Sequence, residues 1–371
     1  MRTTVTGSRE LTGLQRLKIS CFSRGIRIDD MAQRCLTRDG EVPLSIHEYA
    51  TTGGVTLRLE GGVYVNAPFD EWYCENPEAV LTVDSRTGKL AVDFEGEAFP
   101  AEFLPLPGYL GARDTKGRLV SDTVMSHADR ARFSPIAGCA YHCAFCDSPA
   151  AKYARRPVEQ LLAALAVARA DTSLPVRHIL ISGGTPAPRD YAYLDDVYEK
   201  VIRSSDIPVD VMMAPRPDLA IIDKLADWGV YGYALNLEVY DDDVARQVVP
   251  QKHRIGRAQL AAAIERALGC TGGRGRVRSL IVVGLEPLED TLAGVEFLAR
   301  LGCDPVLSPF RPARGTHLAT LVPPSIEFLE RVYLESLDIV ERHGVKLGPR
   351  CIPCQHNTLT FADGTDHYYY T

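Results

Sequence analysis

The sequence has little tryptophan and methionine, no long apolar run and no excess of positive charge. Its 371 residues include two Trp and five Met. No stretch of about 18 apolar residues occurs, so no membrane-spanning helix is expected. The first eight residues lack the apolar core of a secretory signal, which predicts a cytoplasmic protein. The formal net charge of −7 argues against a nucleic-acid-binding surface and favours a small-molecule or peptide-like partner.

The overall composition is that of a globular protein, with 46% hydrophobic and 24% charged residues. A fixed internal repeat and low-complexity tracts are also absent, which excludes solenoid and disordered classes. The ten cysteines are unevenly placed, because three fall within eight residues and two more form a Cys-x-x-Cys pair near the end. In a reducing compartment, clustered thiols indicate metal or redox chemistry more than disulfides. The isolated ones are expected to be small core residues: Cys21, Cys35, Cys74, Cys270 and Cys303.

The pattern along the chain changes near residue 130. Residues 1–128 contain short alternating stretches between Gly- and Pro-rich turns, which predict a β-rich N-terminal module. Residues 129–345 alternate apolar strands with amphipathic helices, which predicts an α/β fold with a partial or full (β/α) TIM-type barrel. A doubly wound open sheet is the alternative, and in both folds ligands bind at the carboxyl ends of the strands. Residues 346–371 form a tail that contains the Cys-x-x-Cys pair.

The predicted elements can be given by residue number. Alternating strands of the N-terminal module are expected at 55–59, 63–65 and 89–94. Barrel strands are expected at 177–182, 209–213, 233–238, 278–283 and 304–308. Helices are expected at 158–170, 219–228, 258–268, 290–301 and 325–343.

The segment GCAYHCAFCD (138–147) brings three cysteines into one loop, Cys139, Cys143 and Cys146. A cubane iron–sulfur cluster normally takes four thiolates, so three would leave one iron open to a substrate or cofactor. A zinc site with His142 as fourth ligand is an alternative, although neighbouring residues rarely direct both side chains at one metal. Chance packing of three thiols is a further alternative, and the polar residues of the loop do not suit it.

The Cys-x-x-x-Cys-x-x-Cys spacing, with Phe145 directly before the last cysteine, resembles the signature of the radical S-adenosylmethionine (radical SAM) superfamily. The resemblance implies a [4Fe-4S] cluster on Cys139, Cys143 and Cys146, with SAM chelating the open iron. It further implies reductive cleavage of SAM to methionine and a 5′-deoxyadenosyl radical that abstracts a hydrogen atom from a small-molecule substrate. An electron donor such as flavodoxin or ferredoxin is implied as partner.

Motifs after the later strands resemble the SAM-binding segments of this superfamily. The segment ISGGTP (181–186) resembles the Gly-Gly motif whose backbone receives the methionine amino group, and glycine allows such close approach. Ser182, Gly183, Gly184 and Thr185 are therefore candidate SAM-binding residues. The family often has Glu where Thr185 stands, and an ordinary turn is the alternative.

The segment LNLE (235–238) resembles a ribose-contacting segment of the biotin-synthase-like branch. By this resemblance Asn236 and Glu238 are the ribose candidates, and a solvated strand-end acid is the alternative for the latter. In the basic, turn-rich loop 249–257, Arg254 resembles the arginine that binds the methionine carboxylate, a role suited to its guanidinium. The runners-up in and beside that loop are Arg246 and Arg257.

Two further segments complete the resemblance, which covers roughly residues 133–316. The segment IVVGLEP (281–287) resembles the region that packs beside adenine, with a plain strand-to-helix turn as alternative. The segment PFRPARGT (309–316) resembles a Pro-x-x-Gly-Thr segment of the biotin-synthase-like branch. Its Arg311 is a candidate for meeting an anionic substrate group.

The pair Cys351 and Cys354 leaves three readings open. With His356 or a distant cysteine it could hold an auxiliary iron–sulfur cluster, it could serve as a catalytic redox pair or hydrogen-atom donor, or it could be structural. An auxiliary cluster would permit radical sulfur insertion of the biotin or lipoyl synthase type. A non-catalytic iron–sulfur or metal carrier is the other alternative, although a carrier has no need of a SAM-binding cradle.

Overall fold

The computed structural model describes residues 9–36, 44, 53–272, 275–363 and 366, so parts of the predicted module and tail, including the first eight residues, lie outside it. The helices are α1 (Gly13–Arg24), α2 (Asp30–Leu36), α3 (Val158–Ala170), α4 (Tyr191–Ser204), α5 (Ala220–Trp228), α6 (Asp242–Val248), α7 (Pro250–Ile255), α8 (Arg257–Thr271), α9 (Leu288–Arg300) and α10 (Ile326–His343). The strands are β1 (Arg27–Ile28), β2 (Val55–Leu59), β3 (Tyr64–Ala67), β4 (Val80–Val83), β5 (Leu90–Phe94), β6 (Glu97–Phe103), β7 (Val124–His127), β8 (Arg130–Phe133), β9 (Ile136–Ala137), β10 (Ala154–Arg155), β11 (His178–Ile181), β12 (Val209–Met212), β13 (Gly232–Ala234), β14 (Val277–Val283) and β15 (Asp304–Pro309).

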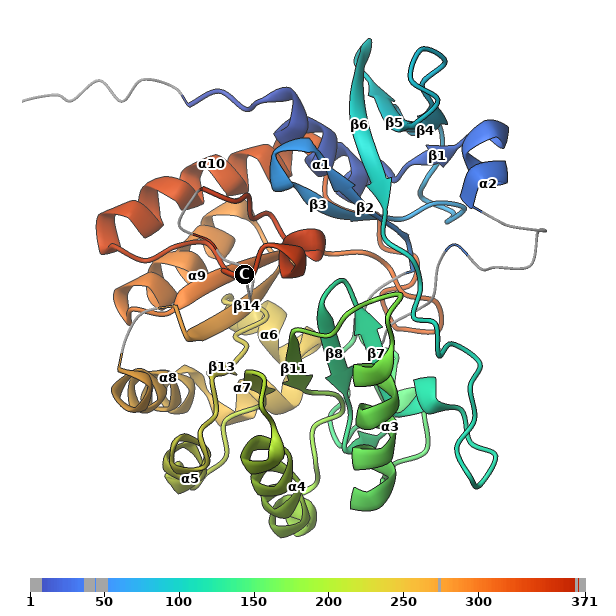
Figure 1. Cartoon of the computed structure of the whole chain (residues 1–371). Helices are drawn as coiled ribbons and strands as arrows, with labels where there is room; N and C mark the ends of the chain where they lie inside the picture. The colour runs from blue at the N-terminus through green and yellow to red at the C-terminus, as the bar shows by residue number, and fades with distance from the viewer. Residues whose placement is uncertain (1–8, 37–43, 45–52, 273–274, 364–365, 367–371) are drawn as a thin grey trace, which may run out of the picture.

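A seven-stranded sheet carries the larger part of the chain. Its order is β15-β14-β13-β12-β11-β8-β7, and the strands from β8 to β15 are parallel and follow one another in chain order. The edge strand β7, which ends just before the predicted boundary at residue 129, is antiparallel to β8. The sheet curls with the helices on its outer side (Figure 1). This confirms the predicted barrel in its partial form, because a doubly wound sheet would reverse the strand order and carry helices on both faces.

Apolar periodicity explains both the strands and the helices of the barrel. All four residues of β11 are buried, as expected of a strand that is covered on both faces. In α10 the buried residues recur every three or four positions, from Leu329 to Val340. Ser325 caps its first turn by accepting a hydrogen bond from the Phe328 N–H, and Gly344 ends it in the left-handed conformation. The helix predicted at 325–343 is therefore confirmed to within one residue.

The N-terminal module is a six-stranded sheet of order β1-β4-β5-β6-β2-β3, antiparallel except between β1 and β4. It also contains α1, which packs on β3 and α10 and was not predicted. The buried face of α1 carries Lys18, whose ammonium donates to the carbonyls of Gln355 and Thr360 at 2.9 and 2.8 Å. This polar residue on the buried face hides the amphipathic pattern of the helix in the sequence.

The C-terminal tail lies along the open side of the barrel, between the barrel and the N-terminal module (Figure 1). Its Leu359 N–H donates to the Leu307 carbonyl of β15 at 2.9 Å. A short 3-10 helix in the tail, η6 (Pro353–Asn357), packs on β3. The tail thus forms part of the wall that the incomplete sheet leaves missing.

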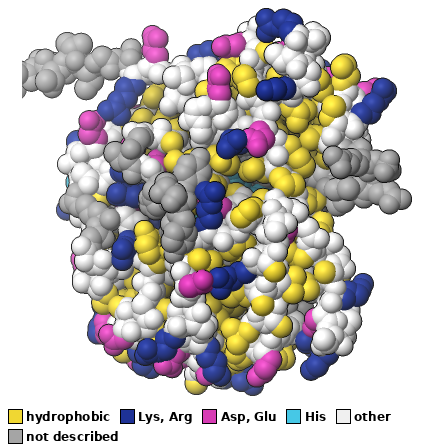
Figure 2. Space-filling view, in the orientation of Figure 1, with side chains coloured by type: hydrophobic (Ala, Val, Ile, Leu, Met, Phe, Trp, Pro, Cys, Tyr) yellow, Lys and Arg dark blue, Asp and Glu magenta, His cyan; other side chains and the backbone are white. Residues whose placement is uncertain are grey.

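The molecular surface carries charges of both signs. On the face in Figure 2, basic and acidic side chains are interspersed among hydrophobic and neutral ones. None of the helices in the described ranges is long and apolar enough to cross a membrane.

Candidate active site

A cavity of about 290 Å³ lies inside the partial barrel and brings together nearly all the predicted site residues. Of the predicted residues, those that line it are Cys139, Cys143, Phe145, Cys146, Ser182, Gly183, Gly184, Thr185, Asn236, Glu238, Cys351 and Cys354. The cysteine loop and the Gly-Gly turn lie at the carboxyl ends of the parallel strands, where the barrel fold predicts ligand binding.

The cysteine loop (138–147) packs directly on the Gly-Gly turn that follows β11. The backbone N–H of Thr185 donates to the sulfur of Cys139 at 3.1 Å. Gly184 has no room for a side chain, because a Cβ atom there would lie 1.6 Å from the carbonyl oxygen of Gly138. The turn therefore fixes the position of the loop, a role that the sequence resemblance did not assign to it.

The three loop cysteines fit a cluster better than a single ion. Cys139 accepts a second amide hydrogen bond from Tyr141 at 3.3 Å, and amide donors stabilise the thiolate form that a metal requires. Burial raises the pKa of the Cys143 thiol to about 12, so metal binding must displace its proton. Among the residues that the structure describes, these three sulfurs are not a group of ligand atoms that all lie within 4.8 Å of one another. Such spreading suits thiolates that bind different irons of one cluster.

His142 contacts Gln251 of α7. Its side chain is exposed, and its Nδ1 lies 3.4 Å from Nε2 of Gln251 in α7. Its backbone N–H donates to Oε1 of the same glutamine at 3.1 Å. The zinc alternative with His142 as fourth ligand therefore has no support in this geometry.

The ribose candidates Asn236 and Glu238 follow β13. Asn236 accepts a hydrogen bond from the Leu280 N–H at 3.3 Å, and the backbone of Glu238 is bonded on both sides to β14. Glu238 is buried and has a φ of 70°, a left-handed conformation that is strained for a residue with a side chain. Gly183, across the cavity, has a φ of 120°, which glycine adopts readily. Strained backbone of this kind is concentrated at functional sites.

Lys252 is a site residue that the sequence reasoning missed. Its ammonium donates to Oε1 of Glu238, and it lines the cavity beside the cysteine loop. Burial by itself lowers the pKa of Lys252, but attraction to Glu238 and to the thiols of Cys143 and Cys139 outweighs it, so the pKa is raised. The lysine therefore remains charged. Its one signal in the sequence is its place in the basic segment 249–257.

Arg254 is not brought to the cavity. The segment that was expected to be a loop forms α7, and residues two apart on a helix point in nearly opposite directions, so Arg254 is exposed. The runners-up Arg246 and Arg257 are exposed too. Two arginines that line the cavity are buried, Arg216 and Arg311, and the guanidinium of Arg216 lies 4.3 Å from the ring centroid of Tyr191.

The inner wall of the cavity is rich in arginine. Arg278 pairs with buried Asp210 at 2.8 Å across neighbouring parts of the sheet. Arg130 and Arg132 line the same cavity from β8, and Arg216 lines it from the segment after β12. Positive charge therefore predominates on this wall.

The end of β14 is the segment expected beside adenine. Val282 lines the cavity, whereas Gly284 packs against Pro324, because a Cβ atom there would lie 2.8 Å from the proline ring. Glu286 accepts two backbone hydrogen bonds at 2.8 Å from the segment after β13. Burial raises the pKa of Glu286 to about 7.

Arg311 joins three parts of the chain. It lines the cavity, donates to Asn66 of β3 at 3.0 Å and donates to Asn357 of the tail at 2.9 Å. The structure therefore gives it a connecting position, whereas the sequence suggested contact with an anionic substrate.

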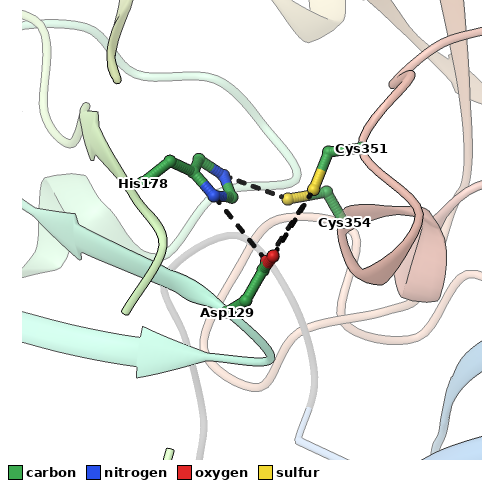
Figure 3. Close-up of side chains that lie close together, drawn as sticks. All are labelled: Asp129, His178, Cys351 and Cys354. Atoms are coloured by element: carbon green, nitrogen blue, oxygen red, sulfur yellow. Dashed lines mark hydrogen bonds and ion pairs between the residues drawn. The ribbon is translucent and has the colours of Figure 1, made fainter. Parts of the chain in front are cut away.

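Cys351 and Cys354 lie at the end of the cavity remote from the cysteine loop. They are close to Asp129, in the turn between β7 and β8, and to His178, at the start of β11 (Figure 3). Asp129 and His178 lie at the amino ends of β8 and β11, whereas the cysteine loop lies at the carboxyl ends of the strands. No motif in the sequence joins Asp129 and His178 to the cysteine pair.

Comparison with known proteins finds one matching family model and several similar solved structures. The family model described as the Radical SAM superfamily matches residues 133–299. No curated protein matches the sequence. Similar solved structures include methylornithine synthase (PylB), 17% identical with a TM-score of 0.48 over 67% of this chain and 77% of that one. A radical SAM methyltransferase from Sphaerobacter thermophilus is 20% identical, with a TM-score of 0.45 over 76% and 80% of the two chains.

HydG, a maturase of the [FeFe]-hydrogenase, is 17% identical with a TM-score of 0.44 over 57% of this chain, and the match spans 49% of the HydG chain. The family match begins at the end of β8 and includes the cysteine loop, the Gly-Gly turn and the segment after β13. Residues 133–299, a little under half of the chain, are therefore similar to the radical SAM superfamily, whose enzymes use a [4Fe-4S] cluster and S-adenosylmethionine.

Proposed function

We propose that this chain cleaves SAM reductively and directs the resulting radical at a C–H bond of a small anionic molecule held in the barrel. When bound, the cluster on Cys139, Cys143 and Cys146 and its SAM supply the 5′-deoxyadenosyl radical that abstracts the hydrogen atom. The observation that carries the proposal is the single cavity shared by the cysteine loop, the Gly-Gly turn, the Glu238–Lys252 pair and the arginine-rich wall.

The residues around the loop have separate positioning roles in this proposal. The backbone of Gly183 and Gly184, with Ser182 and Thr185, receives the methionine end of SAM. Asn236 and Glu238 accept the ribose hydroxyls, and Lys252 holds the Glu238 carboxylate in place.

A carboxylate needs a counter-charge, and Arg216 replaces Arg254 as our candidate for the methionine carboxylate. Arg216 is buried, lines the cavity and is oriented by a salt bridge of 2.6 Å to Asp195. A lysine would keep the charge but lose the planar guanidinium that stacks on Tyr191. Arg216→Lys should raise the KM for SAM with a smaller effect on kcat.

The charge of the inner wall supports a substrate that carries a carboxylate or phosphate group. Arg130, Arg132 and Arg278 line it, and Asp210 is paired with the last of these. Enclosure in the barrel also matters, because a reactive radical must meet its substrate before it meets water. The cavity size falls near that of small-ligand pockets.

The segments 235–238 and 309–316 support a place in the biotin-synthase-like branch. A flavodoxin or ferredoxin is the proposed electron donor, and the clustered thiols support a reducing, cytoplasmic location. Radical sulfur insertion is not favoured, because the ligand atoms around Cys351 and Cys354 lie close enough together for one ion and give no support to a sulfur-donating cluster.

Formation of 5′-deoxyadenosine tests the reaction. Protein reconstituted anaerobically with iron and sulfide is reduced with dithionite and given SAM, and product is measured by chromatography. Cys143→Ala should lose the cluster and the product, whereas Cys270→Ala, at an exposed cysteine, should keep both. A protein that holds its cluster and forms no 5′-deoxyadenosine would contradict the proposal.

The substrate class is tested separately by fractionation. A small-molecule cell extract is divided on an anion exchanger, and each fraction is added to the reduced enzyme with SAM. The retained, anionic fraction should increase 5′-deoxyadenosine formation. An increase from the unretained fraction alone would contradict an anionic substrate and leave the radical reaction intact.

A further inference from the structure

Four side chains with metal-binding atoms meet at the end of the cavity remote from the cysteine loop. Asp129, His178, Cys351 and Cys354 each direct one such atom toward a common centre (Figure 3), and these atoms all lie within 4.8 Å of one another. All four residues are buried, with exposed fractions of 6%, 2%, 2% and 7%. The two cysteines are joined by a turn in which the Cys354 N–H donates to the Cys351 carbonyl at 3.1 Å.

The spacing of these atoms matches a single tetrahedral ion. Zinc bonds of about 2.3 Å to sulfur and 2.0–2.2 Å to nitrogen or oxygen give a tetrahedron with edges of about 3.4–3.8 Å. Here the Cys354 sulfur lies 3.3 Å from Nε2 of His178, and the Cys351 sulfur lies 3.7 Å from Oδ1 of Asp129. His178 offers one ring nitrogen to an ion, so with Nε2 as the ligand its Nδ1, 3.7 Å from the same Asp129 oxygen, would not be part of the tetrahedron. An iron–sulfur cluster would hold these ligands farther apart, because each would bind a different iron.

The charge around the group is also suitable. Two thiolates, one carboxylate and a divalent cation sum to −1. The guanidinium of Arg130 offsets this charge, because its Nη1 lies 4.0 Å from the Cys354 sulfur and can donate to a bound thiolate. Cysteine and histidine ligands select zinc-like ions over magnesium or calcium.

We propose that Asp129, His178, Cys351 and Cys354 bind one divalent ion of the zinc class as a closed structural site. Four protein ligands leave no open coordination position, so the site is not a second catalytic centre. The ligands come from the β7–β8 turn, the start of β11 and the tail, so the ion fastens the tail to the barrel. On binding, the two thiols release their protons to solvent. This assignment takes Cys351 and Cys354 out of the hydrogen-donor role and does not depend on the proposed reaction.

Cobalt binding tests the site directly. The cysteine loop could also take up a free ion, so the background is full-length Cys139→Ser/Cys143→Ser/Cys146→Ser protein, stripped of metal. About one Co²⁺ per chain should bind, with the intense visible bands of tetrahedral cobalt and thiolate-to-cobalt charge transfer, and Zn²⁺ should displace it one for one. Adding Cys354→Ser should weaken binding about 100-fold or more, since even outer partners of a metal ligand are worth 10–100-fold.

A matched control is available at Cys270. This exposed cysteine has its sulfur 3.6 Å from Oδ1 of Asp223, which resembles the Cys351–Asp129 distance. Within the described ranges, however, it belongs to no group of three or more metal-binding side chains. Cys270→Ser in the same background should leave cobalt binding unchanged. Equal binding after Cys354→Ser, or folded background protein that shows no tetrahedral cobalt, would overturn the proposal. Iron and sulfide assembling in the background protein on anaerobic reconstitution would overturn it in favour of a cluster.

A second measurement covers the case in which Cys354→Ser does not fold. The background protein is compared with and without zinc, by thermal unfolding and by limited proteolysis followed with mass spectrometry. Removal of zinc should lower the Tm by several degrees and speed cleavage after about residue 345, and re-addition should reverse both effects. Equal Tm and equal cleavage with and without bound zinc would contradict a structural role.

Discussion

The substitution Gly184→Ala should abolish cluster binding while leaving the fold intact. A Cβ atom at this position would lie 1.6 Å from the carbonyl oxygen of Gly138 and 2.9 Å from Cα of Cys139. Both neighbours are backbone atoms, so no side-chain rotation relieves the overlap. Ordinary contact between such atoms requires about 3.5 Å, so the peptide before Cys139 must move by roughly 1.5–2 Å.

That movement has different consequences for stability and for metal binding. It breaks the hydrogen bonds from Thr185 N to the Cys139 sulfur (3.1 Å) and from Ala140 N to the Thr185 carbonyl (2.9 Å). Overpacking of this kind costs about 1–3 kcal/mol, which a domain with 5–15 kcal/mol of stability survives. Metal–ligand distances tolerate only about 0.2 Å, so a loop displaced by more than 1 Å cannot hold its cluster.

Iron and sulfide content after anaerobic reconstitution is the assay, with thermal unfolding as the check on folding. The native protein should bind about four irons at the loop, and Gly184→Ala should bind almost none there. The control is Gly269→Ala in α8, where a Cβ atom meets nothing within 4 Å. It should keep its cluster and gain up to about 1 kcal/mol of stability. Full iron content in Gly184→Ala would refute the steric reasoning.

Three other substitutions test the site and its supports. Lys252→Met leaves the buried carboxylate of Glu238 without its cation. The KM for SAM in the 5′-deoxyadenosine assay should therefore rise at least about tenfold. An unchanged KM would contradict a role for the pair in SAM binding. Burial raises the pKa of Glu286 from 4.5 to about 7, so the folded state binds this proton more tightly than the unfolded state does. The contribution of protonated Glu286 to the free energy of unfolding is therefore complete below pH 4.5 and is lost as the pH rises through about 7. The free energy of unfolding can be measured with urea at pH 5 and at pH 8 for the native protein and for Glu286→Gln. The difference between variant and native protein should shift in favour of the variant by on the order of 1–3 kcal/mol from pH 5 to pH 8. Arg278→Met removes the cation that is paired with buried Asp210. Urea unfolding should show that the free energy of unfolding falls by about 3–5 kcal/mol. A fall of less than about 1 kcal/mol would mean that water reaches the pair.

The barrel could be predicted because its signals are local. The short apolar runs predicted as strands at 209–213 and 278–283 contain β12 (Val209–Met212) and the greater part of β14, and the helix predicted at 158–170 has those bounds in the structure. The cysteine loop could be singled out for the same reason, since its three cysteines lie within one segment of ten residues. Periodicity and spacing within such short stretches do not depend on the tertiary structure.

The misplacement of Arg254 shows where sequence reasoning stops. The segment 249–257 has five charged or polar side chains, and its proline and glycine suggested a loop. Pro250, however, stands at the first position of α7, where proline is favourable. Once the segment is helical, the side chain that faces the cavity is decided by helix rotation against α6 and α8. About half a turn of helix rotation is enough to exchange Arg254 for Lys252.

The group around Cys351 escaped prediction for a different reason. Asp129 and His178 lie more than 170 residues before Cys351, and each sits at the beginning of a strand or in a turn with no motif around it. Only the pairing of β8 with β11, which places His178 opposite Arg130, brings these residues together. Strand register is a tertiary property, so the cysteine pair could not be assigned partners in advance.

Closure of the cavity depends on the two ends of the chain more than on the barrel itself. Six parallel strands in the described residues do not complete a ring, so the remaining wall comes from the tail beside β15, held there by the Lys18 ammonium on two tail carbonyls. Arg311 adds bonds to Asn66 and Asn357, which link the barrel to the N-terminal module and the tail. These anchors bond largely to backbone carbonyls and amides, which carry no sequence signature. Radical chemistry requires the exclusion of water, so residues outside the superfamily segment should control how often the radical reaches its substrate, even though they touch neither the cluster nor SAM.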